Sequence, residues 1–300
     1  MSNSKFAFFL GCLIPFREAS YEISARRIAG AVGIDLVEMT DANCCGLPID
    51  PINHDMAVAL AARNLCIAES MGLNIMTLCN GCFGSLAKVN KELKEDRALR
   101  EKVNGYLKEI SMEFKGNIEV KHFIEVLAED VGVEKLNSFV SRPFIDLKVA
   151  EHYGCHFLRP HKYLDTGDPE NPEVLTKLIE ITGAKVVDYL DELQCCGGTV
   201  IAIDENVPIS LTRDKLVNIK KAGAEAIVTI CPECHMIFDL YQPRIEKTFS
   251  ESYGLPVLYY PQLLGLAMGM SPEDLAVGEL RVKADRVLNR LIQKARSQLA

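Results

Sequence analysis

Short apolar runs alternate with longer amphipathic stretches along most of the chain. The runs contain Val, Ile and Phe and have the length of buried β-strands, whereas the stretches between them carry the apolar spacing of helices. We expect one strand in each of the ranges 6–12, 34–40, 74–79, 118–131, 148–155, 185–191, 226–231 and 256–270, of which the fourth and the last continue into a helix. Further helices are expected at 17–31, 54–71, 83–112, 172–183, 208–222 and 233–248, followed by an amphipathic helical tail from about Ser271.

This order of elements predicts the fold class. Strands that alternate with helices of ten or more residues form βαβ units and parallel sheets. Because the order repeats, we predict an α/β protein of two similar small parallel-sheet domains in tandem, related by a pseudo-twofold axis. The domains are expected at 1–143 and 144–300, and the second carries the C-terminal helical tail.

The cysteines repeat in the same way. Each half contains one Gly-Cys, one Cys-Cys-Gly and one C-x-x-C, in that order. The Gly-Cys and the doublet are separated by 31 residues in one half and 39 in the other, and the doublet and the C-x-x-C by 33 and 34. Ten of the eleven cysteines belong to this pattern: Cys12, Cys44, Cys45, Cys79, Cys82, Cys155, Cys195, Cys196, Cys231 and Cys234.

The patterned cysteines lie just after predicted strands. In parallel α/β sheets, ligands bind at the carboxyl ends of the strands. Helix N-termini point at the same edge and favour thiolates there. Three loops therefore deliver five sulfurs to one place in each half. The glycines after the doublets, Gly46, Gly197 and Gly198, permit the backbone angles that would let neighbouring thiolates share a site.

The composition restricts the partners and the cellular compartment in which the cysteines would act. A net charge of −8 gives no electrostatic footprint for nucleic acid or an anionic membrane. No apolar run approaches the roughly 20 residues that span a bilayer, and the apolar stretch before Gly11 is shorter than a normal signal core. We expect a cytoplasmic protein with reduced thiols, a setting in which clustered cysteines indicate metal or redox chemistry.

Three kinds of chemistry compete for each five-cysteine set. A structural zinc site uses four ligands and leaves one cysteine idle. A thiol–disulfide exchange site would use the C-x-x-C between strand and helix and ignore the other cysteines. An iron–sulfur centre is the third, although ordinary cubanes need four cysteines and the ferredoxin spacing C-x2-C-x2-C-x3-C-P is absent from the sequence. Five thiolates suit a cluster that is larger than a cubane or differently shaped.

The double pattern C-x31-CC-x33-C-x2-C and C-x39-CC-x34-C-x2-C resembles the pair of cysteine-rich CCG domains. Over nearly its whole length the chain is similar to the B subunit of CoB–CoM heterodisulfide reductase, a family of methanogenic archaea and their relatives. The resemblance implies one noncubane [4Fe-4S] cluster in each half, with the ten patterned cysteines as iron ligands. It also implies a catalytic role in methanogenesis, the reduction of the mixed disulfide of coenzymes M and B to two thiols. We expect the substrate between the halves, where each cluster transfers one electron.

The resemblance implies partners as well. The sequence has no G-x-G-x-x-G fingerprint of a flavin or nicotinamide site. Electrons are therefore expected from two other heterodisulfide reductase chains, the ferredoxin-like C subunit and the flavin- and iron–sulfur-containing A subunit, with a hydrogenase or formate dehydrogenase beyond. Two alternatives stay open. One is an iron–sulfur electron-transfer subunit of a flavin-linked dehydrogenase of the lactate, glycolate or glycerol-3-phosphate type, and the other is a zinc-stabilised scaffold.

Several basic and histidine side chains near the cysteines are candidates for substrate binding. Coenzymes M and B carry sulfonate, carboxylate and phosphate groups, which Arg and Lys recognise well. An alternative role for each candidate is to cap a helix or to face water. The candidates are His122, His156, Arg159, His161, Lys162 and His235. The eleventh cysteine, Cys66, lies on a predicted amphipathic helix, where we interpret it as a small buried hydrophobic residue.

Overall fold

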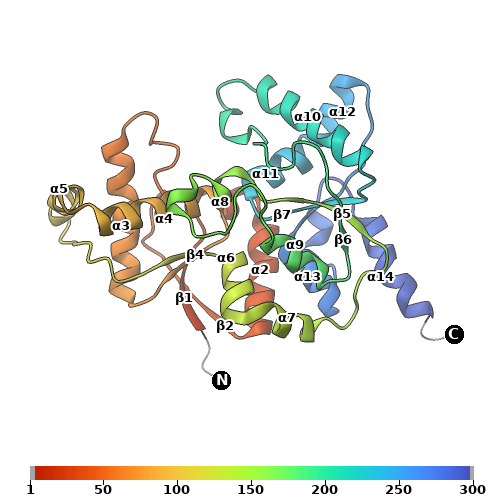
Figure 1. Cartoon of the computed structure of the whole chain (residues 1–300), viewed down its shortest axis with the longest axis horizontal. Helices are drawn as coiled ribbons and strands as arrows, with labels where there is room; N and C mark the ends of the chain where they lie inside the picture. Colours follow the sequence, from red (N-terminus) through yellow and green to blue (C-terminus); the bar gives the residue numbers. More distant parts are fainter. Residues whose placement is uncertain (1–3, 298–300) are drawn as a thin grey trace.

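The chain forms two four-stranded parallel sheets in a computed structural model that describes residues 4–297 (Figure 1). The strand order is β2-β1-β3-β4 in the first sheet and β6-β5-β7-β8 in the second, so one topology is used twice. The first sheet contains β1 (Ser4–Phe9), β2 (Ile34–Glu38), β3 (Ile75–Thr77) and β4 (Val120–His122). The second contains β5 (Lys148–His152), β6 (Lys185–Val186), β7 (Ala226–Thr229) and β8 (Val257–Tyr259).

Helices cover the sheets and connect their strands. The first half contains α1 (Leu13–Arg17), α2 (Ala19–Val32), α3 (His54–Met71), α4 (Asn80–Glu95), α5 (Arg97–Lys108), α6 (Phe123–Glu125) and α7 (Val133–Phe139). The second half contains α8 (Cys155–Leu158), α9 (Val174–Glu180), α10 (Asn206–Lys221), α11 (Pro232–His235), α12 (Gln242–Phe249), α13 (Tyr260–Met268) and α14 (Asp285–Ser297). Because helices cover both faces of a parallel sheet, the inner strands β3 and β7 are buried along their whole length. The predicted α/β class is thus confirmed, and each of the eight predicted ranges overlaps one strand.

The helix predictions differ from the structure mainly at breaks. The range 83–112 is two helices, α4 and α5, because the carboxylate of Asp96 accepts a hydrogen bond from the Leu99 amide at 3.0 Å and caps α5. The range 17–31 is interrupted at Glu18, and 233–248 is divided by a π-helical segment, Met236–Leu240. The helical tail was expected from about Ser271, but its α-helix, α14, begins only at Asp285. Apolar periodicity persists across such short breaks, so it does not reveal them.

The two halves interlock reciprocally. Helix α4, which follows β3, packs on α8 of the second half. Helix α11, which follows β7 and is the equivalent of α4, packs on α1 of the first half. In the same way α2 packs on α13, and α9 on α6. One hydrophobic core continues from the first half into the second. Each contact is thus repeated with the halves exchanged, as the predicted pseudo-twofold relation requires.

Residues 140–147 connect α7 to β5. The predicted boundary between residues 143 and 144 lies in this connection and stays a prediction. The backbone amides of Ser141 and Arg142 donate to the Ala267 carbonyl at 3.1 and 2.8 Å, which ties the connection to α13. Within the part of the chain that the structure describes, no helix is both long enough and apolar enough to cross a membrane.

Candidate metal centre between the two halves

The ten patterned cysteines lie beyond the carboxyl ends of the strands in both sheets. In the first half, Cys12 follows β1, the doublet follows β2, and Cys79 precedes the first residue of α4. The second half repeats this arrangement, with Cys155 as the first residue of α8 and Cys231 directly before α11. All ten are free thiols. The prediction that three loops bring the cysteines to one edge of each sheet therefore agrees with the fold.

Sulfur atoms of the second set are in direct contact. The Sγ atoms of Cys196 and Cys234 are 3.3 Å apart, and those of Cys155 and Cys195 are 3.7 Å apart. The backbone amide of Gly197 donates to the Cys195 sulfur at 3.2 Å. Hydrogen bonds from Cys155 and Cys196 lower the pKa of the Cys195 thiol.

In the first set it is the second cysteine of the doublet whose pKa is lowered. Cys45 accepts hydrogen bonds from Cys44 and Cys82, which lowers the pKa of the Cys45 thiol. Burial and the nearby charge of Cys45 and Cys79 raise the pKa of Cys12. The hydroxyl of Ser85 on α4 donates to the Cys45 carbonyl at 2.7 Å and fixes the doublet loop. The contact of Cys45 with Cys82 matches that of Cys196 with Cys234.

Two glycines make room for the sulfurs. Gly11 and Gly154, which precede the first cysteine of each set, both have positive φ angles, of 72° and 78°. A Cβ atom on Gly11 would lie 2.8 Å from the Cys82 sulfur, and one on Gly154 would lie 3.3 Å from the Cys234 sulfur. Any side chain at these positions would therefore occupy space next to the last cysteine of the set. The glycine of each Gly-Cys is thus needed for two reasons: it adopts a positive φ angle, and it leaves the space beside the last cysteine sulfur open.

This donor set fits a multi-iron centre. Within residues 4–297, no three Cys, His, Asp or Glu side chains are arranged around a single metal-ion position. A cluster does not require such convergence, because its thiolates bind different irons. Five free thiols from three loops, with glycines that keep the space beside them open, form in each half a donor set that could hold an iron–sulfur cluster.

The two sulfur sets face the same interface. Asn80, the first residue of α4, donates from Nδ2 to the Tyr153 carbonyl at 2.5 Å, and this carbonyl lies two residues before Cys155. His156 Nδ1 lies 3.6 Å from the Cys155 sulfur. His156 also lines a small cavity together with Leu47, which follows the first doublet. His156 therefore lies between the two sets.

A buried network that sequence reasoning missed also joins the halves. Glu18, between α1 and α2, accepts a hydrogen bond from the Tyr259 hydroxyl at 2.7 Å and lies 2.8 Å from His235 Nδ1. The Tyr259 ring stacks between His235 and Tyr21, with centroid distances of 4.0 and 3.9 Å. Tyr21 donates to the Ile230 carbonyl at 3.0 Å, next to Cys231. These residues are far apart in sequence, so no local pattern connects them.

The exposed candidates for substrate binding occupy one segment. Arg159 donates to Glu170 Oε1 at 2.9 Å and to the Leu193 carbonyl at 3.4 Å, two residues before Cys195. The Lys162 ammonium lies 4.4 Å from the centre of the Tyr163 ring, and His161 is exposed. The structure therefore brings Arg159 to the second set, whereas His161 and Lys162 line a different cavity beside α4.

His122 and His235 are buried. His122 Nε2 bonds the Leu78 carbonyl at 3.0 Å while Nδ1 accepts from the Ile124 amide at 3.3 Å, so its ring caps α6. Burial lowers the pKa of His122 to about 4 and keeps the ring neutral at pH 7. His235 Nε2 bonds the Val257 carbonyl at 3.0 Å, and its Nδ1 lies 2.8 Å from the Glu18 carboxylate. Both rings have structural partners in the interface, and substrate contact by either stays a prediction.

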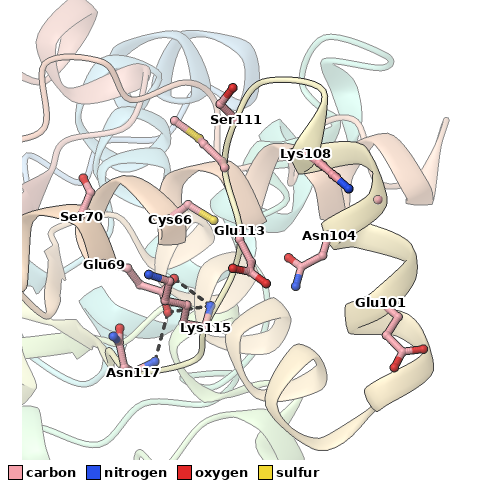
Figure 2. A pocket seen from close by; sticks show the side chains of 12 residues that line it. Cys66, Glu69, Ser70, Glu101, Asn104, Lys108, Ser111, Glu113, Lys115 and Asn117 are labelled. Carbon is pink, nitrogen blue, oxygen red and sulfur yellow. Dashed lines mark hydrogen bonds between the residues drawn. The ribbon is translucent and has the colours of Figure 1, made fainter.

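Cys66 lies apart from both sets. It packs in the core of the first half and lines a cavity of about 930 Å³ between α3, α5 and the loop after α5 (Figure 2). Burial and the charge of Glu69 raise the pKa of the Cys66 thiol to about 12. The Glu69 carboxylate accepts hydrogen bonds from the amides of Lys115, Gly116 and Asn117, which holds the loop in place (Figure 2). The interpretation of Cys66 as a buried hydrophobic residue agrees with this position.

Comparison with known protein families matches the two halves separately. A model of the cysteine-rich CCG domain matches residues 6–87 and 149–239. These ranges contain the first and the second cysteine set, respectively. Fold and cysteine arrangement thus define a protein with two tandem CCG domains.

Whole-chain relatives make the family more specific. The chain is 43% identical to the B subunit of the ferredoxin/F(420)H(2)-dependent CoB-CoM heterodisulfide reductase of Methanosarcina acetivorans, over 91% of this chain and 92% of that one. It is 42% identical to the B subunit of the ferredoxin:CoB-CoM heterodisulfide reductase of Methanosarcina mazei, over 93% and 94% of the two chains. The chain therefore belongs to the family of heterodisulfide reductase B subunits.

Other relatives show how far this architecture extends. The 8-methylmenaquinol:fumarate reductase membrane anchor subunit of Wolinella succinogenes is 34% identical over 95% of this chain and 99% of that one. Among solved structures, a hypothetical protein from Helicobacter pylori superposes with a TM-score of 0.73 at 15% identity and 95% coverage of this chain. The chain spans 53% of that protein, and at this identity the likeness concerns the fold alone.

Proposed function

We propose that this chain is the catalytic subunit of a heterodisulfide reductase. It reduces the mixed disulfide of coenzymes M and B to two thiols, with one noncubane [4Fe-4S] cluster held by each five-cysteine set. The observation that carries the proposal is the reciprocal placement of two complete cysteine sets at one interface, with His156 between them. The identity to two heterodisulfide reductase B subunits supports the same assignment.

The reaction consumes two electrons and two protons. The S–S bond breaks, each sulfur gains one electron and one proton, and two thiols leave. When bound, the clusters supply the electrons one at a time from two sides, which avoids release of a thiyl radical. The chain's own part is to hold the disulfide between the two sets and to bind its charged ends. The α4–α8 and α1–α11 contacts join the helices that carry Cys82 and Cys234 to the opposite half.

A small cavity between the halves is suited to an anionic end of the substrate. Its volume is about 220 Å³, and it is lined by Leu47, which follows the first doublet, and by His156 and Arg159 of the second half. Lys88 of α4 adds a second cation, 3.7 Å from Asp50. Arg recognises carboxylate and phosphate groups through paired hydrogen bonds, and Lys does so as a point charge. We assign Arg159 and Lys88 to charge recognition and His156 to contact near the reacting sulfurs.

The electrons are proposed to come from other chains of the reductase. The C subunit, with ferredoxin-like clusters, would deliver them to this chain from the A subunit, which carries flavin and draws on a hydrogenase or formate dehydrogenase. A second candidate function is electron transfer without a disulfide substrate, as in a flavin-linked dehydrogenase. The relative from Wolinella succinogenes favours that candidate, because it is named as a subunit of a fumarate reductase.

One assay separates the two functions. The chain is purified without oxygen and mixed with reduced benzyl viologen and the CoM–CoB disulfide. Catalytic release of both thiols, followed by dye oxidation and by thiol titration, is the expected result. Rapid oxidation of the protein by an acceptor dye, with no thiol released from the heterodisulfide, would assign the chain to electron transfer instead. A matched Arg159→Lys variant should raise KM for the disulfide and leave the iron content unchanged.

A further inference from the structure

The helix after each cysteine doublet can be compared between the two halves. When the doublets are aligned, Ala57 of α3 aligns with Pro208 of α10. The structure supports this alignment, because a Cβ atom on the glycine after each doublet would lie within 3.0 Å of Ala57 in the first half and of Pro208 in the second. At the same offset, Asn64 of α3 aligns with Lys215 of α10.

The two aligned side chains hold equivalent loops. Both are buried, Asn64 at 0% and Lys215 at 1% exposure. Asn64 donates from Nδ2 to the carbonyls of Asn43 and Cys44, both at 3.2 Å. Lys215 donates from Nζ to the carbonyls that lie three and four residues before Cys195. Each side chain thus holds the backbone that leads into the doublet of its half.

A positive charge is not required for this task. Asn64 is neutral, so an N–H donor is sufficient to hold the loop. Burying an ammonium group costs much more than burying an amide. The hydrogen-bond acceptors of Lys215 are carbonyl oxygens, which compensate its charge only in part. Burial lowers the pKa of Lys215, and the charge of Asp191 opposes this lowering. A further anion beside Lys215 would explain why a cation is retained here.

The surroundings of Lys215 place its charge beside the second cysteine set. Thr212, one turn earlier on the same face of α10, donates to the Cys196 carbonyl at 3.3 Å. The Lys215 ammonium lies 5.6 Å from the centre of the Tyr189 ring. Tyr189 packs in one buried cluster with three cysteines of the second set. Because water is excluded from this cluster, a charge at its edge is poorly screened.

The cation at the corresponding loop of the first half is in a different environment. Arg63, which precedes Asn64, donates to the Asp41 carbonyl and to Asn43 Oδ1, both at 2.8 Å. Arg63 is only partly buried, so water and salt screen its charge. The doublet loop of the first half is thus held by a buried neutral amide and a partly exposed cation, and that of the second half by a buried cation.

We propose that Lys215 raises the reduction potential of the cluster held by the second cysteine set and leaves that of the first set unchanged. This role requires one cluster in each half, so it rests on the proposed function. A cluster gains one negative charge with each electron, and a fixed positive charge nearby stabilises the reduced form. Net charge and solvent exposure are among the features that set the potential of an iron–sulfur cluster. Lys215 therefore makes the two halves inequivalent and favours the electron on the second cluster.

The test measures the potential of each cluster separately. The Cys82→Ser background retains the second cluster and the Cys234→Ser background retains the first. Each iron-loaded chain is titrated anaerobically with dithionite and redox mediators, and its reduction is followed by EPR and visible absorption. In the Cys82→Ser background, Lys215→Gln should lower the equilibrium constant of reduction at least tenfold, which is about 59 mV for one electron. In the Cys234→Ser background the same substitution should have no effect.

Matched variants separate the charge from the hydrogen bonds. Lys215→Gln keeps an N–H donor, as Asn64 has, and Lys215→Met is a second neutral variant that should give the same shift. Lys215→Arg keeps the charge and should retain the wild-type potential. Lys221→Met removes an exposed charge from the end of the same helix and should leave both potentials unchanged.

Iron content is measured before each titration, because it distinguishes the possible failures. An unchanged potential of the second cluster in the iron-loaded Lys215→Gln and Lys215→Met variants would overturn the proposal. Loss of iron from these two variants would also overturn it, because Lys215 would then serve only to hold the loop. Absence of clusters from the wild-type chain would refute the proposed function itself, which is a different result from either of these.

Discussion

Replacing Glu18 by alanine should weaken the association of the two halves. Glu18 is buried and accepts a hydrogen bond from Tyr259 while it also contacts His235, both in the other half. The substitution leaves the Tyr259 hydroxyl without an acceptor and removes the carboxylate beside His235 Nδ1, at about 1–3 kcal/mol each. We therefore expect a loss of about 4 kcal/mol in the free energy of unfolding. At about 2 °C per kcal/mol for a chain of this size, Tm should fall by roughly 8 °C.

Thermal unfolding of the apo chain, followed by circular dichroism, checks this magnitude. Glu22→Ala is the matched control, because Glu22 lies on α2 in an i,i+4 ion pair with Arg26 at 2.8 Å near the surface. Such pairs contribute about 0.5 kcal/mol, so the control should lose about 1 °C. Glu18→Gln retains an acceptor for Tyr259 and should lose about half as much as Glu18→Ala. If Glu18→Ala and Glu22→Ala unfold within about 2 °C of each other, the network does not hold the halves together.

Three further predictions concern the cysteines and one buried acid. Cys195→Ser and Cys196→Ser should each remove or rebuild the cluster of the second half, and unchanged iron content and spectrum in both variants would contradict the ligand assignment. Cys66→Ser should keep cluster content and activity and lose about 1 kcal/mol of stability, because a hydroxyl replaces a buried thiol; loss of iron would show that Cys66 is a ligand. Burial raises the pKa of Glu125 to about 8 from an ordinary value of 4.5. The folded state thus holds an extra proton in this window, and the free energy of unfolding should fall with rising pH by up to about 1.4 kcal/mol per pH unit. Urea unfolding of Glu125→Gln between about pH 6.5 and 8 should show a flatter dependence than the wild type, and an equal slope would refute the role of Glu125.

The fold could be predicted because its signals are local and repeated. Continuous apolar runs such as 226–231 indicate strands buried on both faces, and their recurrence after helical stretches indicates a parallel sheet. The position of the cysteines followed from the same signals, since a residue directly after a parallel strand lies at the ligand-binding edge. The repeat in cysteine spacing added the equivalence of the two halves.

What the sequence did not reveal depends on contacts between distant residues. The bond between Glu18 and Tyr259 joins positions 241 residues apart, and neither residue belongs to a motif. The burial of His122 was also hidden, because its position after a strand is equally typical of a rim residue and of a helix cap. The break at Asp96 is a single capping residue within one continuous apolar pattern.

Iron analysis of matched cysteine variants tests the central claim most directly. The chain is purified and reconstituted without oxygen, and iron, sulfide and zinc are measured together with the EPR spectrum. Two [4Fe-4S] clusters predict about eight irons per chain and no zinc, and Cys82→Ser and Cys234→Ser should each lose about half of the iron. Because both clusters act on one disulfide, each variant should also lose heterodisulfide reduction almost completely, and the double variant should be no worse than either. Substantial turnover in either single variant, with its cluster shown to be absent, would contradict the account, as would zinc in place of iron in the wild type.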